Sequence, residues 1–333
     1  MGESREKGNL TIEDIAEALG ISKTTVSRSI SGKGRIGEET RQRVLRYIRE
    51  NNYKPSPLAK GLAQSRTYNI GWAMPGDSTV TDAPFFLRCT IGIAKEAAPM
   101  DYDILNVLMH DKDISQLQRV VENRKVDGVI LGRTLMSDPG VAFLKKSKIP
   151  FVVIGSTQEK NVIQIDNDHI RACRELTSAL VKKGIKKIAL IGGDMSHVVN
   201  QTRQKGFQEG VKELASEKVL YYTDCEERED IQKAVVDAVK KRTECLVCMD
   251  DRICYNALYK LHSENISIPD EIKIASFYDS QIIANNRPAI TALQYDPKEL
   301  GMVACRTLLK VISGEEAEEK VLLGYELRMT ESV

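Results

Sequence analysis

Residues 11–31 read TIEDIAEALGISKTTVSRSIS, and this stretch decides the fold of the N-terminal part of the chain. Apolar residues recur here at positions i, i+3, i+4 and i+7 and predict a first helix with one buried side, formed by Ile12, Ile15, Ala16 and Leu19. Thr11 followed by Asp14 is typical of a capping box at the start of that helix. Gly20 then supplies the left-handed backbone conformation that a tight turn requires.

A second helix is predicted directly after the turn. Ser22 is a good N-cap for it, and Val26 and Ile30 form its buried side. Its outward side carries side chains that can donate to phosphates and base edges: Lys23, Thr24, Ser27 and Arg28. Helix-turn-helix proteins contact bases with the N-terminal part of such a helix, in the major groove. Taken alone, the pattern also fits any small pair of amphipathic helices.

The segment that follows favours the DNA-binding interpretation. Glu38 to Asn51 predicts a third helix, with Val44 and Ile48 inward and four arginines outward. Residues 20–66 contain 11 Lys and Arg against 3 Asp and Glu, whereas the whole chain carries a net charge of only +1. The basic excess is therefore local, as expected for a module that neutralises phosphates.

The order Thr-(x)2-Asp-Ile-Ala-(x)3-Gly-Ile-Ser-(x)2-Thr-Val-Ser-Arg, followed by Thr40-Arg41 and by Asn52-Tyr53-Lys54-Pro55, resembles the headpiece of the lactose/purine repressor family. The similarity extends along the whole chain. It implies that Lys23 and Thr24 select bases and that Arg28 is the major-groove arginine. It also implies supporting or phosphate contacts from Ser22, Thr25, Ser27, Arg35 and Tyr53. Gly37 departs from the usual hydroxyl N-cap of the third helix, at a cost of a few tenths of a kcal/mol.

Residues 56–67 are predicted to form a linker with a short hinge helix. Ser56 and Pro57 suit a helix start, but the helical stretch ends at Ala63 and contains Gly61, so it is too short to be stable alone. In the family such a segment pairs with that of a second subunit in the minor groove, which implies DNA contacts from Ala59, Lys60 and Leu62, with Leu62 as the wedge. Without the headpiece, a plain linker would be the simpler interpretation.

From Tyr68 onward, short apolar runs alternate with amphipathic stretches such as Asp168 to Lys183. This alternation predicts an α/β fold of doubly wound parallel sheets. About 265 residues exceed one usual domain, so we expect two lobes with a ligand cleft between them. The resemblance implies a core like that of periplasmic binding proteins. We therefore expect a headpiece at 1–55, a hinge at 56–67 and a core at 68–333, with lobe one at 68–162 and 295–322 and lobe two at 163–294 and 323–333.

Composition excludes several classes of protein. No run of 18 apolar residues is present and the N-terminus is polar, so we expect a cytoplasmic protein without a membrane partner. Seven scattered cysteines suit a reducing compartment. Cys245 and Cys248 have the spacing of a redox or zinc pair, but on a strand they point to opposite faces and are expected to be core thiols. The four histidines do not have the spacing of metal ligands, and the sequence has no phosphate-binding loop beyond Gly192-Gly193. We therefore expect neither a cofactor nor enzymatic activity.

The resemblance places an effector site in the cleft. It implies effector contacts from Phe85, His197, Arg203 and Asp250, with Asp166-Asn167 as a retained pair. Ser276-Phe277-Tyr278-Asp279 stands where the family has Gly-(Phe/Tyr)-Asp-Asp, so Tyr278 replaces the ligand-binding acid. Arg203 would then lack a usual counter-charge, which predicts an anionic effector such as a sugar acid or sugar phosphate. If Asp250, Asp251 or Asp279 turns inward instead, an ordinary neutral sugar site results.

These observations predict a sequence-specific transcriptional regulator, most simply a repressor. It would bind a pseudo-palindromic operator as a homodimer under the control of a small carbohydrate or carbohydrate derivative. A nucleobase effector in the same architecture and an α/β enzyme fused to a DNA-binding domain are the alternatives.

Overall fold

The structure is a computed structural model that describes residues 10–31, 34–51, 53, 64–76, 84–110 and 113–333. The chain folds as two compact units, residues 1–67 and 68–333. The first contains the expected headpiece and hinge, and the second is the expected core. Among the described residues, no helix has the length and apolar character needed to cross a membrane.

The headpiece contains the predicted helices, α1 (Ile12–Leu19), α2 (Lys23–Ser31) and α3 (Glu38–Glu50). The capping box is present, because the Asp14 amide donates to Thr11 Oγ1 over 3.2 Å and the Thr11 amide donates to Asp14 Oδ2 over 2.8 Å. Gly20 adopts a φ of 63° and ends α1. The predicted start and end of α1 are therefore confirmed, and α3 ends at Glu50, one residue before the predicted Asn51.

One small apolar core holds the headpiece helices together. Val26 and Val44 are fully buried in it, and Tyr53 joins them. Ile30 was expected to be as buried as Val26 but is only partly buried, since Ser29 occupies the innermost position of that turn. The Ser29 hydroxyl is satisfied there by donating to the Thr25 carbonyl over 2.8 Å.

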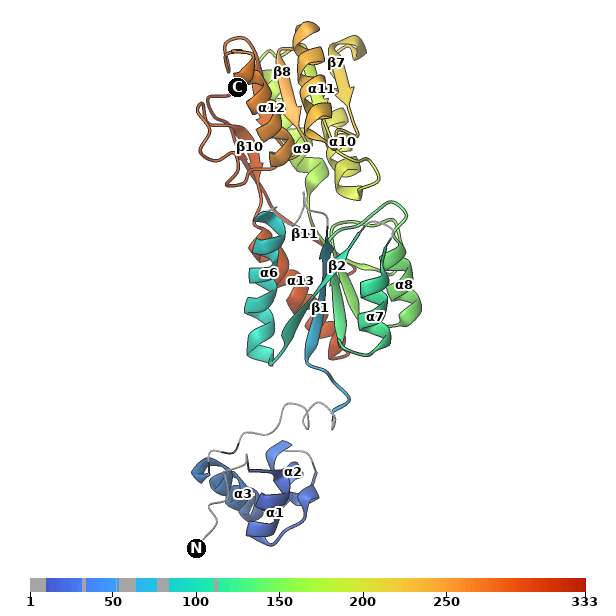
Figure 1. Ribbon diagram of the computed structural model, residues 1–333, viewed down its shortest axis with the longest axis vertical. Coiled ribbons are helices and arrows are strands. Elements are labelled where there is room, and N and C mark those ends of the chain that lie inside the picture. Colours follow the sequence, from blue (N-terminus) through green and yellow to red (C-terminus); the bar gives the residue numbers. More distant parts are fainter. Residues whose placement is uncertain (1–9, 32–33, 52, 54–63, 77–83, 111–112) are drawn as a thin grey trace, which may run out of the picture. The chain divides into compact units, whose positions relative to one another are not determined.

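Lobe one of the core is a six-stranded parallel sheet in the order β11-β5-β4-β3-β1-β2. Its strands are β1 (Asn69–Pro75), β2 (Asp103–Met109), β3 (Gly128–Leu131), β4 (Phe151–Ile154), β5 (Ile163–Asn167) and β11 (Lys320–Leu323). Its helices are α6 (Pro84–Ala97), α7 (Ser115–Glu122), α8 (Pro139–Ser147) and α13 (Pro297–Ile312). Figure 1 shows α6 and α13 on one face of this sheet and α7 and α8 on the other.

Successive side chains of the strands of lobe one point into two separate apolar cores. Ile130 packs with the α6 and α13 side chains, whereas its neighbours Val129 and Leu131 pack with those of α7 and α8. The pleat of a strand produces this division, because successive side chains point to opposite faces. A sheet covered on both faces explains why its strands are almost continuously apolar.

Lobe two repeats the same architecture, with the strand order β12-β10-β9-β8-β6-β7. Its strands are β6 (Ile188–Ile191), β7 (Val219–Tyr222), β8 (Cys245–Cys248), β9 (Lys273–Ser276), β10 (Thr291–Gln294) and β12 (Glu326–Arg328). Its helices are α9 (His169–Lys182), α10 (Val198–Gly210), α11 (Arg228–Lys240) and α12 (Asp251–Ser263). All pairs are parallel except β10 with β12.

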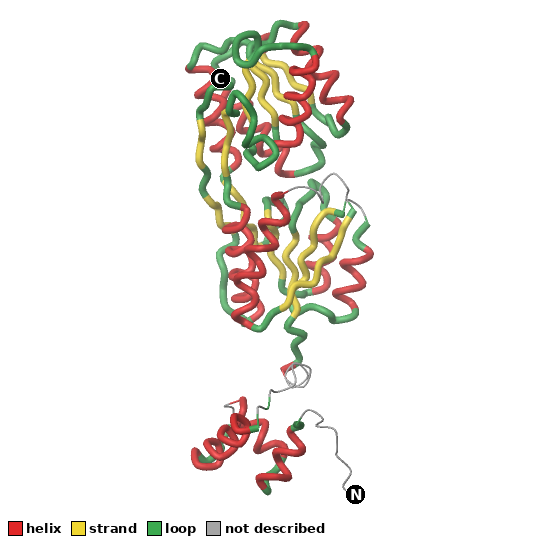
Figure 2. The backbone as a smooth tube through the Cα atoms, turned by 60° about the vertical axis from the view of Figure 1, so that its left-hand side comes forward, coloured by secondary structure: helices red, strands yellow, loops and turns green. Residues whose placement is uncertain are grey.

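The chain passes between the lobes three times, after β5, after β10 and after β11 (Figure 2). The expected boundary at residue 162 is wrong, since residues 163–167 form β5 and pair with β4 and β11 inside the sheet of lobe one. Ile165 is fully buried in that sheet, which is what holds the segment there. The last passage likewise lies after Leu323 and not after residue 322.

Cys245 and Cys248 are both fully buried on β8. Burial raises the pKa of the Cys245 thiol to about 12 and that of Cys248 well above its ordinary value. Such thiols remain protonated near neutral pH, so neither is a reactive thiolate. They pack in the core of lobe two with the other apolar side chains.

Candidate functional site

The exposed side of α2 is the candidate DNA-reading surface. Ser22 begins the helix, with its Oγ accepting from the Thr25 amide over 3.0 Å and lying 2.9 Å from Thr25 Oγ1. The side chains beyond this cap are exposed, namely Lys23, Thr24, Ser27 and Arg28. With Val26 held in the core below, α2 presents these four to solvent on its N-terminal turns, where base-reading residues of helix-turn-helix proteins lie.

The other expected DNA contacts differ in their surroundings. Lys23 forms an ion pair with Glu13, but both side chains are more than 60% exposed, and such a pair exchanges readily for a phosphate or base contact. Arg35 is exposed. Tyr53 is buried in the headpiece core, and burial raises the pKa of its phenol, so it supports the fold more than it faces solvent. Ala59, Lys60 and Leu62 lie outside the described residues.

A cavity of about 230 Å³ lies between the two lobes of the core. It is found at the carboxyl ends of the strands, next to the points where the strand order reverses, β1/β3 in lobe one and β6/β8 in lobe two. Open α/β sheets bind ligands at this place because loops leave neighbouring strands in opposite directions. The lining residues are Phe85, Phe86, Gly132, Arg133, Thr134, Ile154, Gly155, Asp166, Asn167, His169, Val199, Arg203, Asp250, Asp251, Arg252, Tyr278, Tyr295 and Leu300.

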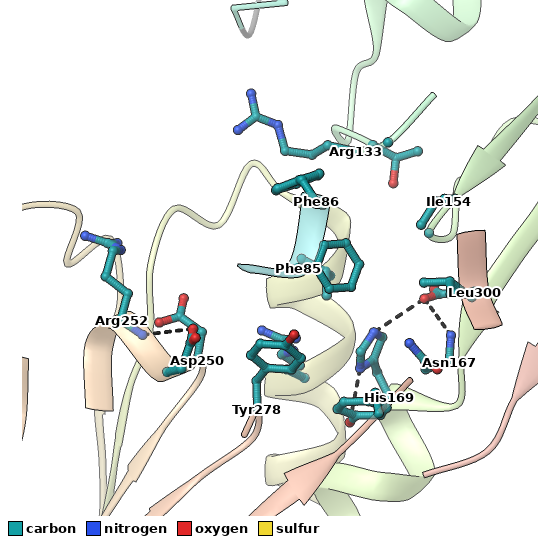
Figure 3. A pocket seen from close by; sticks show the side chains of 18 residues that line it. Phe85, Phe86, Arg133, Ile154, Asn167, His169, Asp250, Arg252, Tyr278 and Leu300 are labelled. Atoms are coloured by element: carbon teal, nitrogen blue, oxygen red, sulfur yellow. Dashed lines mark hydrogen bonds and ion pairs between the residues drawn. The ribbon is translucent and has the colours of Figure 1, made fainter. Parts of the chain in front are cut away.

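Aromatic rings form a continuous row across this cavity (Figure 3). Phe85 lies edge-on to Tyr278, with ring centroids 6.1 Å apart, and Tyr278 stacks on Tyr295 at 6.2 Å. The loop that carries Tyr278 is fixed by Ser276, whose Oγ donates to the Tyr278 carbonyl over 2.8 Å. The ring of Tyr278 therefore lies in this cavity.

A buried polar cluster closes one side of the cavity. Asp166 Oδ1 lies 3.4 Å from His169 Nε2, and Asp166 Oδ2 accepts from the Ser156 hydroxyl over 2.8 Å. His169 Nδ1 lies 3.3 Å from the Tyr295 hydroxyl. Burial alone would raise the pKa of Asp166, but His169 and the hydrogen bonds outweigh it and hold that pKa below its ordinary value. The carboxylate is thus ionised and fully engaged.

Arg203 is a buried cation of the cavity that has no carboxylate partner among the described residues. It extends from α10, is 91% buried, and its Nη1 donates to the Met249 carbonyl over 2.8 Å. Its Nε is buried and has no hydrogen-bond partner among the described residues. Within the same part of the chain, no carboxylate forms an ion pair with it. A buried guanidinium in this condition favours a ligand that brings an acceptor or a negative charge.

Two aspartates of the cavity lining, Asp250 and Asp251, form hydrogen bonds with groups other than Arg203. Asp250 caps α12, with its Oδ1 accepting from the Ile253 amide over 2.7 Å. Asp251 accepts from the Ser280 hydroxyl and from the Arg252 amide. Burial, together with the charge of Asp250, raises the pKa of Asp251 above its ordinary value. Neither carboxylate neutralises Arg203 by direct contact.

Four of the five expected effector residues line the cavity: Phe85, Arg203, Asp250 and Tyr278. His197 does not line it. It precedes α10, its ring faces Asp194 at 3.8 Å, and its backbone bridges to Leu135 of lobe one. Sequence reasoning also missed Arg133, Tyr295 and the involvement of His169, since only the strand order brings those loops together.

The backbone beside the cavity joins the two lobes directly. The Met136 amide donates to the Ser196 carbonyl over 2.9 Å, and the Val198 amide donates to the Thr134 carbonyl over 3.2 Å. Together with the bridge between Leu135 and His197, these bonds form a short antiparallel connection that we call the latch, residues 134–136 with 196–198. The lobes are therefore in contact on this side of the cavity.

Known proteins resemble the chain along almost its entire length. Catabolite control protein A of Staphylococcus xylosus is 25% identical over 325 residues, which cover 96% of this chain and 97% of that protein. The lac repressor dimer bound to operator and the anti-inducer ONPF superimposes with a TM-score of 0.78 at 18% identity, covering 98% and 99% of the two chains. The complex of the transcriptional regulator CelR with cellobiose gives a TM-score of 0.72 at 23% identity, covering 98% and 100%.

Two sequence families match separate parts of the chain. Residues 11–56 match the bacterial regulatory proteins of the lacI family, and residues 177–333 match the periplasmic binding protein-like domain. The first match contains the helix-turn-helix, and the second covers most of lobe two. The order of these parts and the fold of the core agree with the full-length relatives. The chain therefore combines a DNA-binding domain of the lacI family of bacterial regulatory proteins with a periplasmic binding protein-like core, as in transcriptional regulators.

Proposed function

We propose that this protein is a repressor that binds a pseudo-palindromic operator as a homodimer and changes its operator affinity when a small effector occupies the cavity between the lobes. The observation that carries this proposal is the joining of a lacI-type helix-turn-helix headpiece to a two-lobed core with a ligand-sized cleft at its strand ends. An effector that binds one arrangement of the lobes more tightly than another shifts operator affinity by that difference.

Arg28 is the residue expected to carry most of the base recognition. It lies on the exposed side of α2, and an arginine there can pair with the major-groove edge of guanine. We expect Arg28→Ala to weaken binding to a specific operator by about 1 to 3 kcal/mol while sparing random DNA. Fluorescence anisotropy with both duplexes at one salt concentration measures the two losses. Equal losses of affinity for the two duplexes would show that Arg28 does not read bases.

Exposed apolar side chains on the core support the dimer. Leu87 and Ile91 on α6 are 64% and 50% exposed, and Tyr255 and Tyr259 on α12 are 50% and 49% exposed. Each pair is spaced at i and i+4 and so lies on one side of its helix. Burying these faces in a second copy would remove them from water. Sedimentation equilibrium should give twice the chain mass of 37.2 kDa.

The effector is proposed to be an anionic carbohydrate derivative, a sugar acid or sugar phosphate. Arg203 has no carboxylate partner and would form a charge-assisted pair with the anion. Phe85 and Tyr278 offer apolar ring faces to the sugar. The regulator CelR, which shares the fold, was solved with a bound carbohydrate, cellobiose. The cavity volume of about 230 Å³ suits a small ligand.

A binding screen tests the effector class. Isothermal titration calorimetry of the full chain with neutral sugars, sugar acids, sugar phosphates and nucleobases should find the anionic sugars tightest. Arg203→Met should weaken the best anion by about tenfold to a hundredfold, as expected for the loss of a charge-assisted pair. Tighter binding of neutral sugars, or an Arg203→Met variant with unchanged anion affinity, would contradict the anionic assignment. An operator titration with and without the bound compound then tests regulation itself.

A further inference from the structure

A second and larger cavity, of about 660 Å³, also lies between the lobes. Its walls come from α10 of lobe two, and from the loop after β4 and strand β11 of lobe one. Asp166, Asn167 and His169 line both cavities, so the first passage of the chain between the lobes separates them. Unlike the aromatic cavity, this one contains no aromatic ring in its lining apart from His169.

Helix α10 presents a polar stripe to this cavity. Gln201, Gln204, Lys205 and Gln208 all line it. Their spacing of i, i+3, i+4 and i+7 places them on one side of the helix. The opposite side is buried, with Gly206 against α9 and the ring of Phe207 against those of Tyr221 and Phe277. The amphipathic pattern of α10 thus directs amide and ammonium groups toward the space between the lobes.

The lining includes two lysines beside the carboxylates of Asp166 and Asp168. Lys205 lies on α10 and Lys320 on β11, in opposite lobes. Neither forms an ion pair or side-chain hydrogen bond within the described ranges. The carboxylates of the lining are engaged, Asp166 with His169 and Asp168 with the Arg171 amide, whose nitrogen lies 3.2 Å from its Oδ1.

Two side-chain oxygens in this wall are buried without a hydrogen-bond partner in the part of the chain that the structure describes. They are Asn167 Oδ1 and Gln204 Oε1, and the Asn167 side chain is 96% buried. A buried acceptor without a donor is costly, so a molecule that brings hydroxyl groups into the wall would be stabilised there. Amide oxygens together with two ammonium groups form a donor and acceptor set suited to a hydroxylated anion.

We propose that this cavity is a second ligand site, distinct from the effector cavity, which takes a phosphate monoester of a polyol or sugar. The phosphate lies between Lys205 and Lys320, and the hydroxyl groups bond to the glutamine stripe of α10 and to Asn167. Because its walls belong to both lobes, a bound molecule stabilises their present arrangement. The shared wall couples this site to the aromatic cavity, so the two ligands influence each other's affinity reciprocally.

Sorbitol 6-phosphate is a suitable probe, because an open-chain polyol offers no ring face to the aromatic row of the first cavity. Calorimetry of the full chain should show binding of sorbitol 6-phosphate at least about tenfold tighter than binding of inorganic phosphate or of sorbitol. Equal affinity for inorganic phosphate would overturn the role of the glutamines. Absence of sorbitol 6-phosphate binding would overturn the site.

Substitutions in the lining test where sorbitol 6-phosphate binds. The double variant Lys205→Met with Lys320→Met should weaken sorbitol 6-phosphate binding at least about tenfold. Gln208→Glu, an exposed change that leaves both lysines in place, should weaken it by bringing a carboxylate to the same wall. The matched control is Lys212→Met, an exposed lysine outside the lining, which should have no effect.

Arg203→Met distinguishes this site from the effector site. It should leave sorbitol 6-phosphate affinity within about twofold of that of the parent protein, even if the proposed effector fails to bind at all. Loss of the probe in Arg203→Met together with full binding in the double lysine variant would place the probe in the aromatic cavity and refute the second site.

Discussion

The two lobes of the core share one topology but contribute different chemistry to the cleft. In each, five strands follow the order 2-1-3-4-5, and a sixth arrives from a late passage of the chain. Lobe one contributes mainly apolar groups to the cavity of about 230 Å³, such as Phe85, Phe86 and Ile154. Lobe two contributes the charged groups Arg203, Asp250, Asp251 and Arg252, whereas the charged side chains from lobe one are Arg133 and Asp166. The strand order fixes where a binding residue can lie, and the loops decide what it does.

Both lobes also rely on glycines at close contacts between helices. A Cβ atom on Gly92 of α6 would lie 2.0 Å from the Lys298 carbonyl oxygen of α13, and one on Gly301 would lie 2.2 Å from that of Cys89. In lobe two, a Cβ on Gly206 of α10 would lie 2.5 Å from the carbonyl oxygen of Ile170 in α9. Backbone atoms cannot move aside as a flexible side chain can, so these pairs tolerate no side chain.

The largest expected effect comes from breaking these helix pairs. Gly92→Ala should lower the free energy of unfolding of lobe one by about 3 kcal/mol, and Gly206→Ala should cost lobe two about 2 kcal/mol, because each forces two helices apart. Trp72, the only tryptophan of the chain, is fully buried in lobe one, so its fluorescence during urea unfolding reports on that lobe, whereas circular dichroism follows both.

Gly324→Ala is the matched control, because a Cβ there meets no atom within 4 Å, and its effect should stay within about 0.5 kcal/mol. If the lobes unfold independently, Gly206→Ala will shift the circular dichroism transition and not the Trp72 transition. Coincident shifts in both variants would show that the lobes unfold as one unit. A Gly92→Ala protein as stable as the control would contradict the close-packing argument.

The contact between the two lobes can be tested at the latch, which joins them. Met136→Pro removes the amide that donates to the Ser196 carbonyl. The neighbouring bond from the Val198 amide to Thr134 should then open more often, and exchange of the Val198 amide should accelerate by about tenfold, as expected for the loss of roughly one hydrogen bond. Hydrogen exchange with mass spectrometry of a peptide covering residues 194–199 measures this.

Leu135→Ala is the control for the latch, because it keeps every backbone donor and acceptor of the connection. In this variant, the exchange rate of the Val198 amide should stay within about twofold of its value in the parent protein. Unchanged protection in Met136→Pro would mean that the lobes are held in contact by side chains and that the latch contributes little.

Local signals made the headpiece predictable. The capping pair of Thr11 and Asp14, the left-handed Gly20 and the buried Val26 all act within a few residues of their place in the sequence, and the structure confirms each. Ser29 was missed because a serine buried in a helix is satisfied by the carbonyl four residues earlier, which no composition pattern reveals.

The cleft was less predictable, because it joins segments that lie far apart in the sequence. Of the residues that the family resemblance suggested, Phe85, Arg203 and Tyr278 line the cavity between the lobes, whereas His197 does not and its backbone enters the latch. Strand β5 does carry a signal, since Ile163 and Ile165 alternate with Gln164 and Asp166, which is the period of a strand. Its pairing with β4 and β11 decides to which lobe the strand belongs, and only the folded sheet shows that pairing.

The smallest expected effect contrasts one aspartate from each lobe. The pKa of Asp166 lies below its ordinary value, because His169 and hydrogen bonds from Ser156 and Asn167 outweigh its burial. The pKa of Asp251 lies above its ordinary value, because it is buried beside Asp250. The first therefore stabilises the fold above the unfolded-state pKa near 3.8, and this contribution disappears as the pH falls through the lower native pKa. The second destabilises the fold as the pH rises from about 3.8 through its higher native pKa.

Substitution by asparagine should consequently change the pH dependence of stability in opposite directions. Relative to the parent protein, Asp166→Asn should lose stability as the pH rises from about 3 to about 7, whereas Asp251→Asn should gain it over the same interval. Urea unfolding at a series of pH values gives both differences, and the slopes are informative even though Asp166→Asn also weakens the contact with His169. Slopes of the same sign for the two variants would show that the environments of these carboxylates are alike, and that the chemical difference between the lobes does not extend to their acids.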